Sequence, residues 1–363
     1  MRTQLELKEI CSKFAIYGDF LVAVPFGSGH INDTYQVTYD QGGVRLHYTL
    51  QRINHHVFKN PVQVMENVDR VTNHLLHKIR TRHIETKKRT LRLLRTFTNH
   101  PYVKDDAGNH WRAYVVVENA RSYEVLESED QAFMAAKAFG EFQCDLTDLP
   151  GPRLHETIVD FHNTPKRLEK LRQAIKLDKL GRAKAVKREI DFVFEREADA
   201  GKLIKLNQAG DIPERITHND TKVNNILIDD LTGEGICVID LDTVMPGLAL
   251  YDFGDMVRAG TSPAEEDEVD LSKVGMRFSM FEAMLKGFLA SSGGFLTPAE
   301  RENLPFAGKL ITLEVGMRFL TDYLEGDVYF KVKHERHNLD RCRNQFKLAE
   351  SMEYQMPKMM KLL

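Results

Sequence analysis

The chain has 363 residues, of which 42% are hydrophobic and 28% charged, so it is long enough to bury a large core and to form two lobes or domains. The formal net charge of −3 gives no overall electrostatic reason to expect nucleic acid or an anionic membrane as a partner. Any phosphate-binding site must therefore be local.

The first 18 residues form a short amphipathic stretch, and neither they nor any later segment have the apolar run of a signal peptide or a membrane span. The four cysteines, Cys11, Cys144, Cys237 and Cys342, are too far apart for a metal-binding motif and are predicted to be free thiols. We expect a cytoplasmic protein that binds neither nucleic acid nor membrane and is a monomer or a weak homodimer.

Residues 21–119 are predicted to be rich in β-strands around one helix. The stretch "FLVAVPF" is typical of a strand, and "TYQVTYDQGGVRLHYTLQRI" alternates around a Gly-Gly turn, which favours a hairpin. A second hairpin is predicted from "HPYVKD" and "HWRAYVVVEN". Between the two, after Pro61, four apolar residues recur on one face of a predicted helix: Val64, Val68, Val71 and Leu75.

After residue 119 the pattern changes to long helical segments, so we set the lobe boundary there. One helix is predicted from "DQAFMAAKAFGEFQCDL", and another begins at Thr164, the expected N-cap, with Pro165 behind it. The basic residues of the second segment are interpreted as a solvated helix face, with a nucleic-acid face as the alternative. The apolar residues among them recur at core spacing: Leu168, Leu171 and Ile175.

Polar residues with a regular spacing follow in "ITHNDTKVNNILIDDLTGEGICVIDLDT", residues 216–243. Two apolar runs flank "DDLTGE", which has the turn chemistry of a hairpin. An antiparallel pair centred on Thr232 and Gly233 puts Asn225 opposite Asp240. Asp220 lies in the loop that enters the same end of this predicted hairpin.

These residue types match the needs of phosphoryl transfer from a nucleotide. A carboxylate and an amide oxygen suit a hard cation such as Mg²⁺, so Asn225 and Asp240 are the predicted metal ligands. An acid near the accepting hydroxyl is also needed, and Asp220 is the predicted base or orienting group. Asp242 is a candidate supporting residue or ligand of a second metal. Taken one by one, these residues have turn and cap roles as their alternative.

The segments "THNDTKVNNIL" and "VIDLDT" resemble the aminoglycoside phosphotransferase and choline kinase-like superfamily, whose loop has His-x-Asp-x-x-x-x-Asn followed by a metal-binding Asp. Beyond these segments, "FGSGHINDTY", "TIVDFHNTP", "GMRFLTDYLEGDVYF" and "KHERHNLDR" are similar to the N-acetylhexosamine 1-kinase family. The resemblance covers nearly the whole chain. It implies a two-lobed, protein-kinase-like α/β (α+β) fold, with a β-rich, nucleotide-binding N-lobe over residues 1–119 and a mainly helical C-lobe over residues 120–363 that carries the catalytic loop, the metal site and the sugar site.

The resemblance also implies roles for single residues. Asp220 resembles the catalytic Asp that contacts the anomeric hydroxyl of the sugar, and Asn225 and Asp240 resemble the magnesium ligands. His218 is similar to a residue that supports the loop, and Asp252, within a literal Asp-Phe-Gly, to a structural brace. The positions similar to sugar contacts are His30, Thr243, Arg318 and Tyr329. For Arg318 a surface salt bridge, and for Tyr329 a half-buried core position, are the alternatives.

The residues that would contact the nucleotide phosphates are less well defined by the sequence. In "GSGHIN", Gly27 and Gly29 would let backbone amides approach phosphates, with a plain hairpin turn as the alternative. Kinase folds usually place a strand lysine near these phosphates, but "YTLQRIN" has Gln51 and Arg52 instead. Strand alternation puts these two residues on opposite faces, and the sequence does not decide which face meets the nucleotide.

The expected reaction is transfer of the γ-phosphoryl group of ATP, with Mg²⁺, to the anomeric hydroxyl of N-acetylglucosamine or N-acetylgalactosamine. Two alternatives stay open. One is a kinase of the same superfamily that acts on choline, an aminoglycoside or another sugar. The other is a catalytically silent sensor that binds nucleotide or sugar.

Overall fold

The computed structural model describes residues 2–27, 31–81 and 89–363. The chain divides into two compact units, and neither is one continuous stretch of sequence. The first unit consists of Met1–Ala120, Asp148–Val159 and Ile236–Met245. The second consists of Arg121–Thr147, Asp160–Gly235 and Pro246–Leu363. The first unit therefore includes two short segments that come much later in the sequence than the rest of it.

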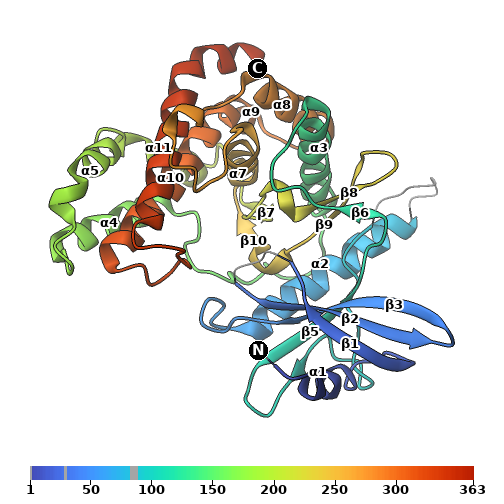
Figure 1. Ribbon diagram of the computed structural model, residues 1–363. Coiled ribbons are helices and arrows are strands. Elements are labelled where there is room, and N and C mark those ends of the chain that lie inside the picture. Colours follow the sequence, from blue (N-terminus) through green and yellow to red (C-terminus); the bar gives the residue numbers. More distant parts are fainter. Residues whose placement is uncertain (1, 28–30, 82–88) are drawn as a thin grey trace. The chain divides into compact units, whose positions relative to one another are not determined.

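The first unit is built on a five-stranded antiparallel sheet with the order β1-β2-β3-β5-β4 (Figure 1). Between β2 and β3, Gly42 and Gly43 have φ angles of +67° and +91°, the left-handed backbone that a two-residue hairpin turn requires. Both hairpins predicted for this part of the chain are present. The elements of the first unit are α1 (Gln4–Cys11), β1 (Asp19–Pro25), β2 (Asp33–Gln41), β3 (Val44–Arg52), α2 (Pro61–Thr81), β4 (Val103–Lys104), β5 (His110–Val115) and the 3₁₀ turn η4 (Leu241–Thr243).

One face of this sheet forms the core of the first unit together with α1. Leu50 of β3 and Trp111 of β5 are fully buried there against Phe14 and the helix residue Leu7. Strand alternation puts the next residues, Gln51 and Arg112, on the opposite face, and the register pairs the two directly. The sheet therefore has an apolar face and a face with a buried polar pair.

The helix α2 forms hydrogen bonds with both of the short segments that complete the first unit, 148–159 and 236–245. Its four predicted core residues are all buried, as the periodicity indicated. Asn67 on the same helix donates hydrogen bonds to the carbonyls of His155, at 2.8 Å, and Val244, at 3.0 Å, and accepts one from the amide of His155. One buried side chain thus ties segments 148–159 and 236–245 to the same helix.

The second unit is mainly helical, and α10 lies at its centre against α4, α7 and α11. A Cβ at Gly254 of α7 would lie 2.5 Å from the carbonyl oxygen of Ala307 in α10, so only glycine permits this close helix contact. The elements are α3 (Glu129–Asp145), α4 (Thr164–Leu177), η1 (Ala183–Val186), α5 (Lys187–Phe194), η2 (Glu197–Asp199), α6 (Lys202–Ala209), β7 (Arg215–Thr217), η3 (Val223–Asn225), β8 (Ile226–Asp229), α7 (Ala249–Thr261), η5 (Leu271–Lys273), α8 (Phe278–Ser292), α9 (Pro298–Glu302), α10 (Leu304–Glu325), α11 (His337–Met359) and η6 (Met360–Leu362).

Three short strands span the limits between the units: β6 (Ala120–Arg121), β9 (Gly235–Val238) and β10 (Met245–Gly247). The predicted turn "DDLTGE" follows β8, where the amide of Asp229 donates to the carbonyl of Glu234 and the amide of Gly233 donates to the carbonyl of Asp229, both at 2.9 Å. The two apolar runs on either side are strands β8 and β9, as predicted.

The N-cap of α4 differs from the sequence-based prediction. The prediction of Thr164 as N-cap is wrong by one residue, because Asn163 caps α4 by accepting a hydrogen bond from the amide of Lys166. The hydroxyl of Thr164 donates to Glu314 instead.

All four cysteines are free thiols, as predicted, and burial raises the pKa of Cys11 to about 12. Within residues 2–27, 31–81 and 89–363, no helix is both long and apolar enough to cross a bilayer.

Candidate active site

The loop between β7 and η3 is fixed by a buried carboxylate of α7. Asp252 is fully buried and accepts the amides of His218, at 2.9 Å, and Asn219, at 2.7 Å, while its carbonyl accepts the hydroxyl of Thr221 at 2.6 Å. Burial raises the pKa of Asp252, although these amide donors oppose the rise. The prediction that Asp252 braces this loop is confirmed, and both carboxylate oxygens are engaged in doing so.

The bracing places Asp220 beside Asn225. The amide nitrogen Nδ2 of Asn225 donates to the carbonyl oxygen of Asp220 at 2.8 Å and to its Oδ2 at 3.1 Å. Among the hydrogen bonds of the residues that the structure describes, the side chain of Asn225 takes part only through Nδ2, and its Oδ1 accepts none. The oxygen that would coordinate a hard cation is therefore the atom left open.

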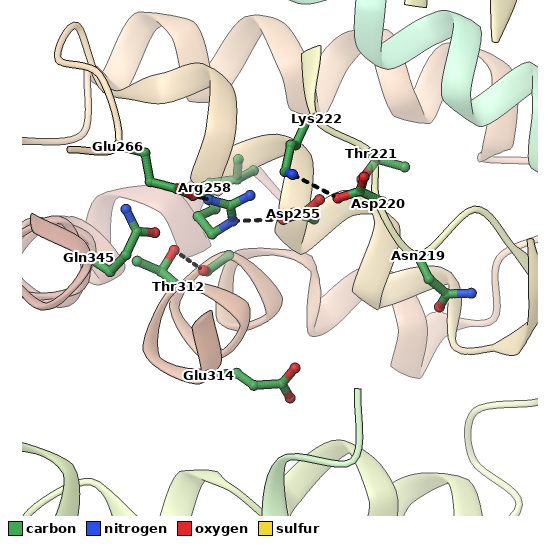
Figure 2. Close-up of polar contacts among 12 residues, drawn as sticks. Asn219, Asp220, Thr221, Lys222, Asp255, Arg258, Glu266, Thr312, Glu314 and Gln345 are labelled. Carbon is green, nitrogen blue, oxygen red and sulfur yellow. Dashed lines mark hydrogen bonds and ion pairs between the residues drawn. The ribbon is translucent and has the colours of Figure 1, made fainter. Parts of the chain in front are cut away.

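Charged residues gather around Asp220 (Figure 2). Lys222 Nζ lies 3.3 Å from Asp220 Oδ1, and Arg258 of α7 forms ion pairs of 2.7 Å with Asp255 and with Glu266. Burial raises the pKa of Asp220, but the positive charges of Lys222 and other neighbouring groups outweigh it and hold the pKa below the ordinary 3.8. Asp220 is therefore a carboxylate at neutral pH and can accept the hydrogen bond of a substrate hydroxyl.

A prediction follows from this ion pair. Replacing Lys222 by methionine removes a positive charge beside Asp220, so the pKa of Asp220 rises and the acid limb of the kcat/KM profile moves to higher pH. The measurement is kcat/KM between pH 3 and pH 8, because the acid limb of the unaltered protein is expected on the acid side of the ordinary 3.8. Lys222→Arg, which keeps the charge, should leave the acid limb where it is in the unaltered protein. An acid limb that stays in place in Lys222→Met would contradict the assignment.

A second buried pair supports the loop from α10. His162 Nδ1 lies 2.8 Å from Glu314 Oε1, and its Nε2 lies 2.9 Å from the carbonyl oxygen of Asn219, next to Asp220. Burial lowers the pKa of His162, but Glu314 and the carbonyl of Asn219 raise it above its ordinary value overall. Sequence reasoning did not identify this pair. His162 lies within a stretch that was singled out only for its resemblance, and Glu314 lies two residues before another such stretch.

The predicted sugar residues Arg318 and Tyr329 come together within the second unit. The guanidinium carbon of Arg318 lies 6.0 Å from the ring centre of Tyr329. The backbone amides of Tyr329 and its neighbour Phe330 donate to the buried carboxylate of Asp322, at 2.8 Å and 3.0 Å, which holds both rings in place. Tyr329 is 48% exposed, so it is not a core ring, and in the described residues Arg318 forms no ion pair.

In the first unit, the polar face of the sheet carries a buried ion pair that sequence reasoning missed. Arg112 contacts Asp242, which also accepts a 2.6 Å hydrogen bond from Asn32. The Nε of Arg112 donates to Oε1 of Gln51 at 3.0 Å. Burial lowers the pKa of Arg112, but Asp242 more than offsets this and the pKa is raised. The carboxylate of Asp242 is thus held by Arg112 and Asn32, a role that its sequence context did not indicate.

The structure separates the two candidates for the missing strand lysine. Gln51 lies on the face of the sheet that carries Arg112 and Asp242. Arg52 lies on the other face and donates to Asp33 at 2.8 Å and to Asn109 at 3.2 Å. Gln51 is therefore the candidate on the same side as the segment that contains Asp240.

The remaining predicted residues are placed as follows. Asp240 precedes η4 with a left-handed backbone, φ +57°, an uncommon conformation for an aspartate, and Thr243 ends η4 and is buried. Gly27 has φ +81°, which favours glycine. The predicted residues Gly29 and His30 lie outside the described residues. Asn225 belongs to the second unit and Asp240 to the first, so their pairing across a metal stays a prediction.

A prediction tests the ion pair of the first unit. Arg112→Lys keeps the positive charge for Asp242 but removes the Nε donor to Gln51, so we expect the free energy of unfolding to fall by about 1–2 kcal/mol. Urea unfolding measures this loss. The matched control is Arg95→Lys, at a partly exposed pair with Asp69 in the same unit, which should change it by less than about 0.5 kcal/mol. Equal losses in both variants would contradict the role given to Arg112.

Comparison with known proteins shows the family and the fold of the chain. The sequence profile described as "Phosphotransferase enzyme family" matches residues 22–275, and the chain belongs to this family. Among solved structures, an aminoglycoside phosphotransferase from Alicyclobacillus acidocaldarius is 14% identical, with a TM-score of 0.61, and covers 98% of this chain and 95% of its own. A microcompartment-associated aminopropanol kinase is 13% identical, with a TM-score of 0.60 and 99% coverage of both chains.

A third solved structure, the GDP complex of aminoglycoside 2′-phosphotransferase-IIIa, is 12% identical, with a TM-score of 0.59, and covers 95% of this chain and 99% of its own. At these identities the likeness concerns the fold. The expected fold class, a β-sheet N-lobe and a helical C-lobe of the kinase-like type, is thereby confirmed.

Proposed function

We propose that this phosphotransferase is a kinase that transfers the γ-phosphoryl group of ATP, with Mg²⁺, to the C1 hydroxyl of an N-acetylhexosamine and so forms the sugar 1-phosphate. The observation that carries the proposal is the pairing of Asp220 with Asn225 on a loop that Asp252 and His162 hold from two sides. Such a loop presents a charged carboxylate to a hydroxyl and an amide oxygen to a cation.

In this proposal Asp220 accepts the hydrogen bond of the C1 hydroxyl and orients its oxygen toward the phosphorus atom. Asn225 and Asp240 would hold Mg²⁺, and an open amide oxygen together with a carboxylate is a donor set that fits this hard cation. The cation, when bound, supplies positive charge against the phosphate oxygens. The protein itself contributes positioning and fixed charge rather than covalent chemistry.

The nucleotide would lie along the polar face of the sheet in the first unit. Gln51 lies on that face, so we assign it, rather than Arg52, to the phosphate side. Gly27 and Gly29 would let backbone amides approach the phosphates. A GDP complex of a structure with the same fold supports a nucleotide as co-substrate.

The sugar would contact Arg318 and Tyr329, with His30 and Thr243 as further contacts. A guanidinium offers five donors in a plane, which suit carbonyl and hydroxyl oxygens, and a half-exposed tyrosine ring can lie against the face of a sugar. An acceptor with an acetamido group and several hydroxyls uses both properties.

The test is phosphorus NMR of the purified protein with ATP, Mg²⁺ and either N-acetylglucosamine or N-acetylgalactosamine. A new sugar 1-phosphate signal is the expected result. If ATP stays intact with both sugars but is consumed with ethanolamine, choline or an aminoglycoside, the acceptor is a different alcohol. If no acceptor of this panel consumes ATP, while the nucleotide or a sugar binds, the chain is a sensor and the proposal fails.

A further inference from the structure

Two guanidinium groups of the second unit converge on Phe161. Arg318 of α10 lies over three rings, with its guanidinium carbon 4.9 Å from the ring centre of Phe161, 5.6 Å from that of Phe330 and 6.0 Å from that of Tyr329. Arg167 of α4 donates from Nε, at 3.2 Å, and from Nη2, at 2.7 Å, to the carbonyl oxygen of Phe161. One residue thus positions both cations.

Among the described residues, no carboxylate is paired with either of these two guanidinium groups. Over the residues that the structure describes, neither Arg167 nor Arg318 forms an ion pair within 4.0 Å. Glu314, whose charge acts on both, is engaged by His162. Asp160, which also acts on Arg167, is paired with Lys166 at 2.6 Å. Burial lowers the pKa of Arg167, and the charge of Arg318 lowers it further, so the two guanidinium groups repel each other.

The donors of Arg318 remain available for a ligand. No hydrogen bond to Arg318 occurs within residues 2–27, 31–81 and 89–363, and its contacts there are the faces of the three rings. Such contacts fix the guanidinium plane without using its N–H groups. A positively charged surface with free donors favours an oxygen atom of the ligand and repels an ammonium group.

We propose that Arg167 and Arg318 select the acceptor by charge, with Arg318 donating to an uncharged oxygen group such as the acetamido carbonyl and Arg167 raising the positive charge that rejects an ammonium group at that place. This inference rests on the proposed function and deepens it. Arg167 is then a specificity-determining residue, and amine-bearing sugars are excluded although they fit the site by size.

The test compares two sugars that differ at one nitrogen, N-acetylglucosamine and glucosamine, as acceptors between pH 6 and pH 9. The quantity measured is the ratio of their kcat/KM values, because enzyme groups that titrate affect both sugars and cancel. For the unaltered protein the ratio should favour the acetylated sugar most strongly at low pH. It should fall as the amine of glucosamine loses its proton. This part needs no variant and does not depend on the folding of one.

The variant Arg167→Gln should reduce the ratio about tenfold at the lowest pH and leave it unchanged at the highest, since only the charged amine is repelled. Arg167→Lys keeps the charge and should keep the ratio. The matched control is Arg172→Gln on the same helix, at an exposed pair with Glu197, which should behave as the unaltered protein.

Several results would overturn the inference. They are a ratio that does not vary with pH, a ratio that Arg167→Gln leaves unchanged, and a ratio that this variant changes equally at every pH, as a purely structural role would. Turnover of N-acetylglucosamine with any of these results overturns the inference alone. If the protein phosphorylates neither sugar, the same comparison is made with N-acetylgalactosamine and galactosamine. If it phosphorylates none of the four sugars at any pH, the proposed function fails and the inference fails with it.

Discussion

Replacing Asp220 by asparagine is expected to lower kcat for phosphoryl transfer about a thousandfold. The amide keeps the size of the side chain and can still accept the hydrogen bond of Asn225, but it carries no charge and cannot take a proton. A positioned general base contributes roughly 10²- to 10⁴-fold to such reactions. The measurement is the initial rate of ADP formation at saturating nucleotide, Mg²⁺ and acceptor.

The same variant separates a catalytic role from a structural one. The ion pair of Asp220 with Lys222 is partly exposed, so its loss should change the free energy of unfolding by less than about 1 kcal/mol. The matched control is Asp191→Asn, at an exposed pair with Lys187 on α5, which should leave both rate and stability unchanged. An Asp220→Asn protein that keeps more than about a tenth of the activity would exclude Asp220 as the base.

Removing Glu314 is expected to cause the largest loss of stability. Glu314→Ala leaves His162 buried without its carboxylate and the hydroxyl of Thr164 without its acceptor. Breaking a buried ion pair from one side costs about 3–5 kcal/mol, which urea unfolding would detect as a lower midpoint. Because His162 also holds the carbonyl of Asn219, the loop of Asp220 should loosen and activity should fall as well.

The pH dependence of this loss follows from the two pKa shifts. The folded-state pKa of His162 is raised, so its contribution is fully present below the ordinary 6.5 and is lost as pH rises through the folded value. For Glu314, burial raises the pKa, but His162 and the hydroxyl of Thr164 lower it more. Its contribution is therefore present above the ordinary 4.5 and is lost as pH falls through the folded value. The difference between the unaltered protein and Glu314→Ala should be largest between about pH 4.5 and 6.5.

The control for this prediction lies on the same helix. Glu325 at the end of α10 pairs with Lys170 at 3.0 Å in a partly exposed position, and Glu325→Ala should cost less than about 1 kcal/mol. If both variants lose the same free energy, or if the loss in Glu314→Ala does not vary with pH, the buried pair does not carry a net charge interaction. Glu314→Gln, which keeps the shape but not the charge, would then behave as the unaltered protein.

Local pattern was enough to predict much of the fold. The Gly42-Gly43 turn, the helix face of α2 and the hairpin turn after β8 each depend on neighbouring residues, so their chemistry is visible in short stretches of sequence. The brace at Asp252 was expected from the resemblance and is present. The single-residue error at Thr164 has a clear cause, because a distant carboxylate, Glu314, competes for its hydroxyl.

The partners that fix the site from a distance could not be predicted in this way. Arg112 and Asp242 are 130 residues apart, and His162 and Glu314 are 152 apart. Neither pair belongs to a periodic pattern or a motif with fixed spacing. A single Arg or His in a strand or loop is also compatible with many purely structural roles. The aromatic rings around Arg318 could likewise not be predicted, because Phe161 and Phe330 come from different parts of the chain.

The discontinuous make-up of the first unit has a consequence for its synthesis on the ribosome. Arg112 meets its counter-ion only after a further 130 residues have been made, about 6–26 s later at roughly 5–20 residues per second. Until then Arg112 of β5 has no counter-ion, and Asn67, which can already reach the carbonyl of His155, still lacks that of Val244. The strands of the sheet are therefore synthesised first, but the first unit is complete only when segment 236–245 has been made. Until then the N-terminal unit stays incomplete while part of the helical unit is translated.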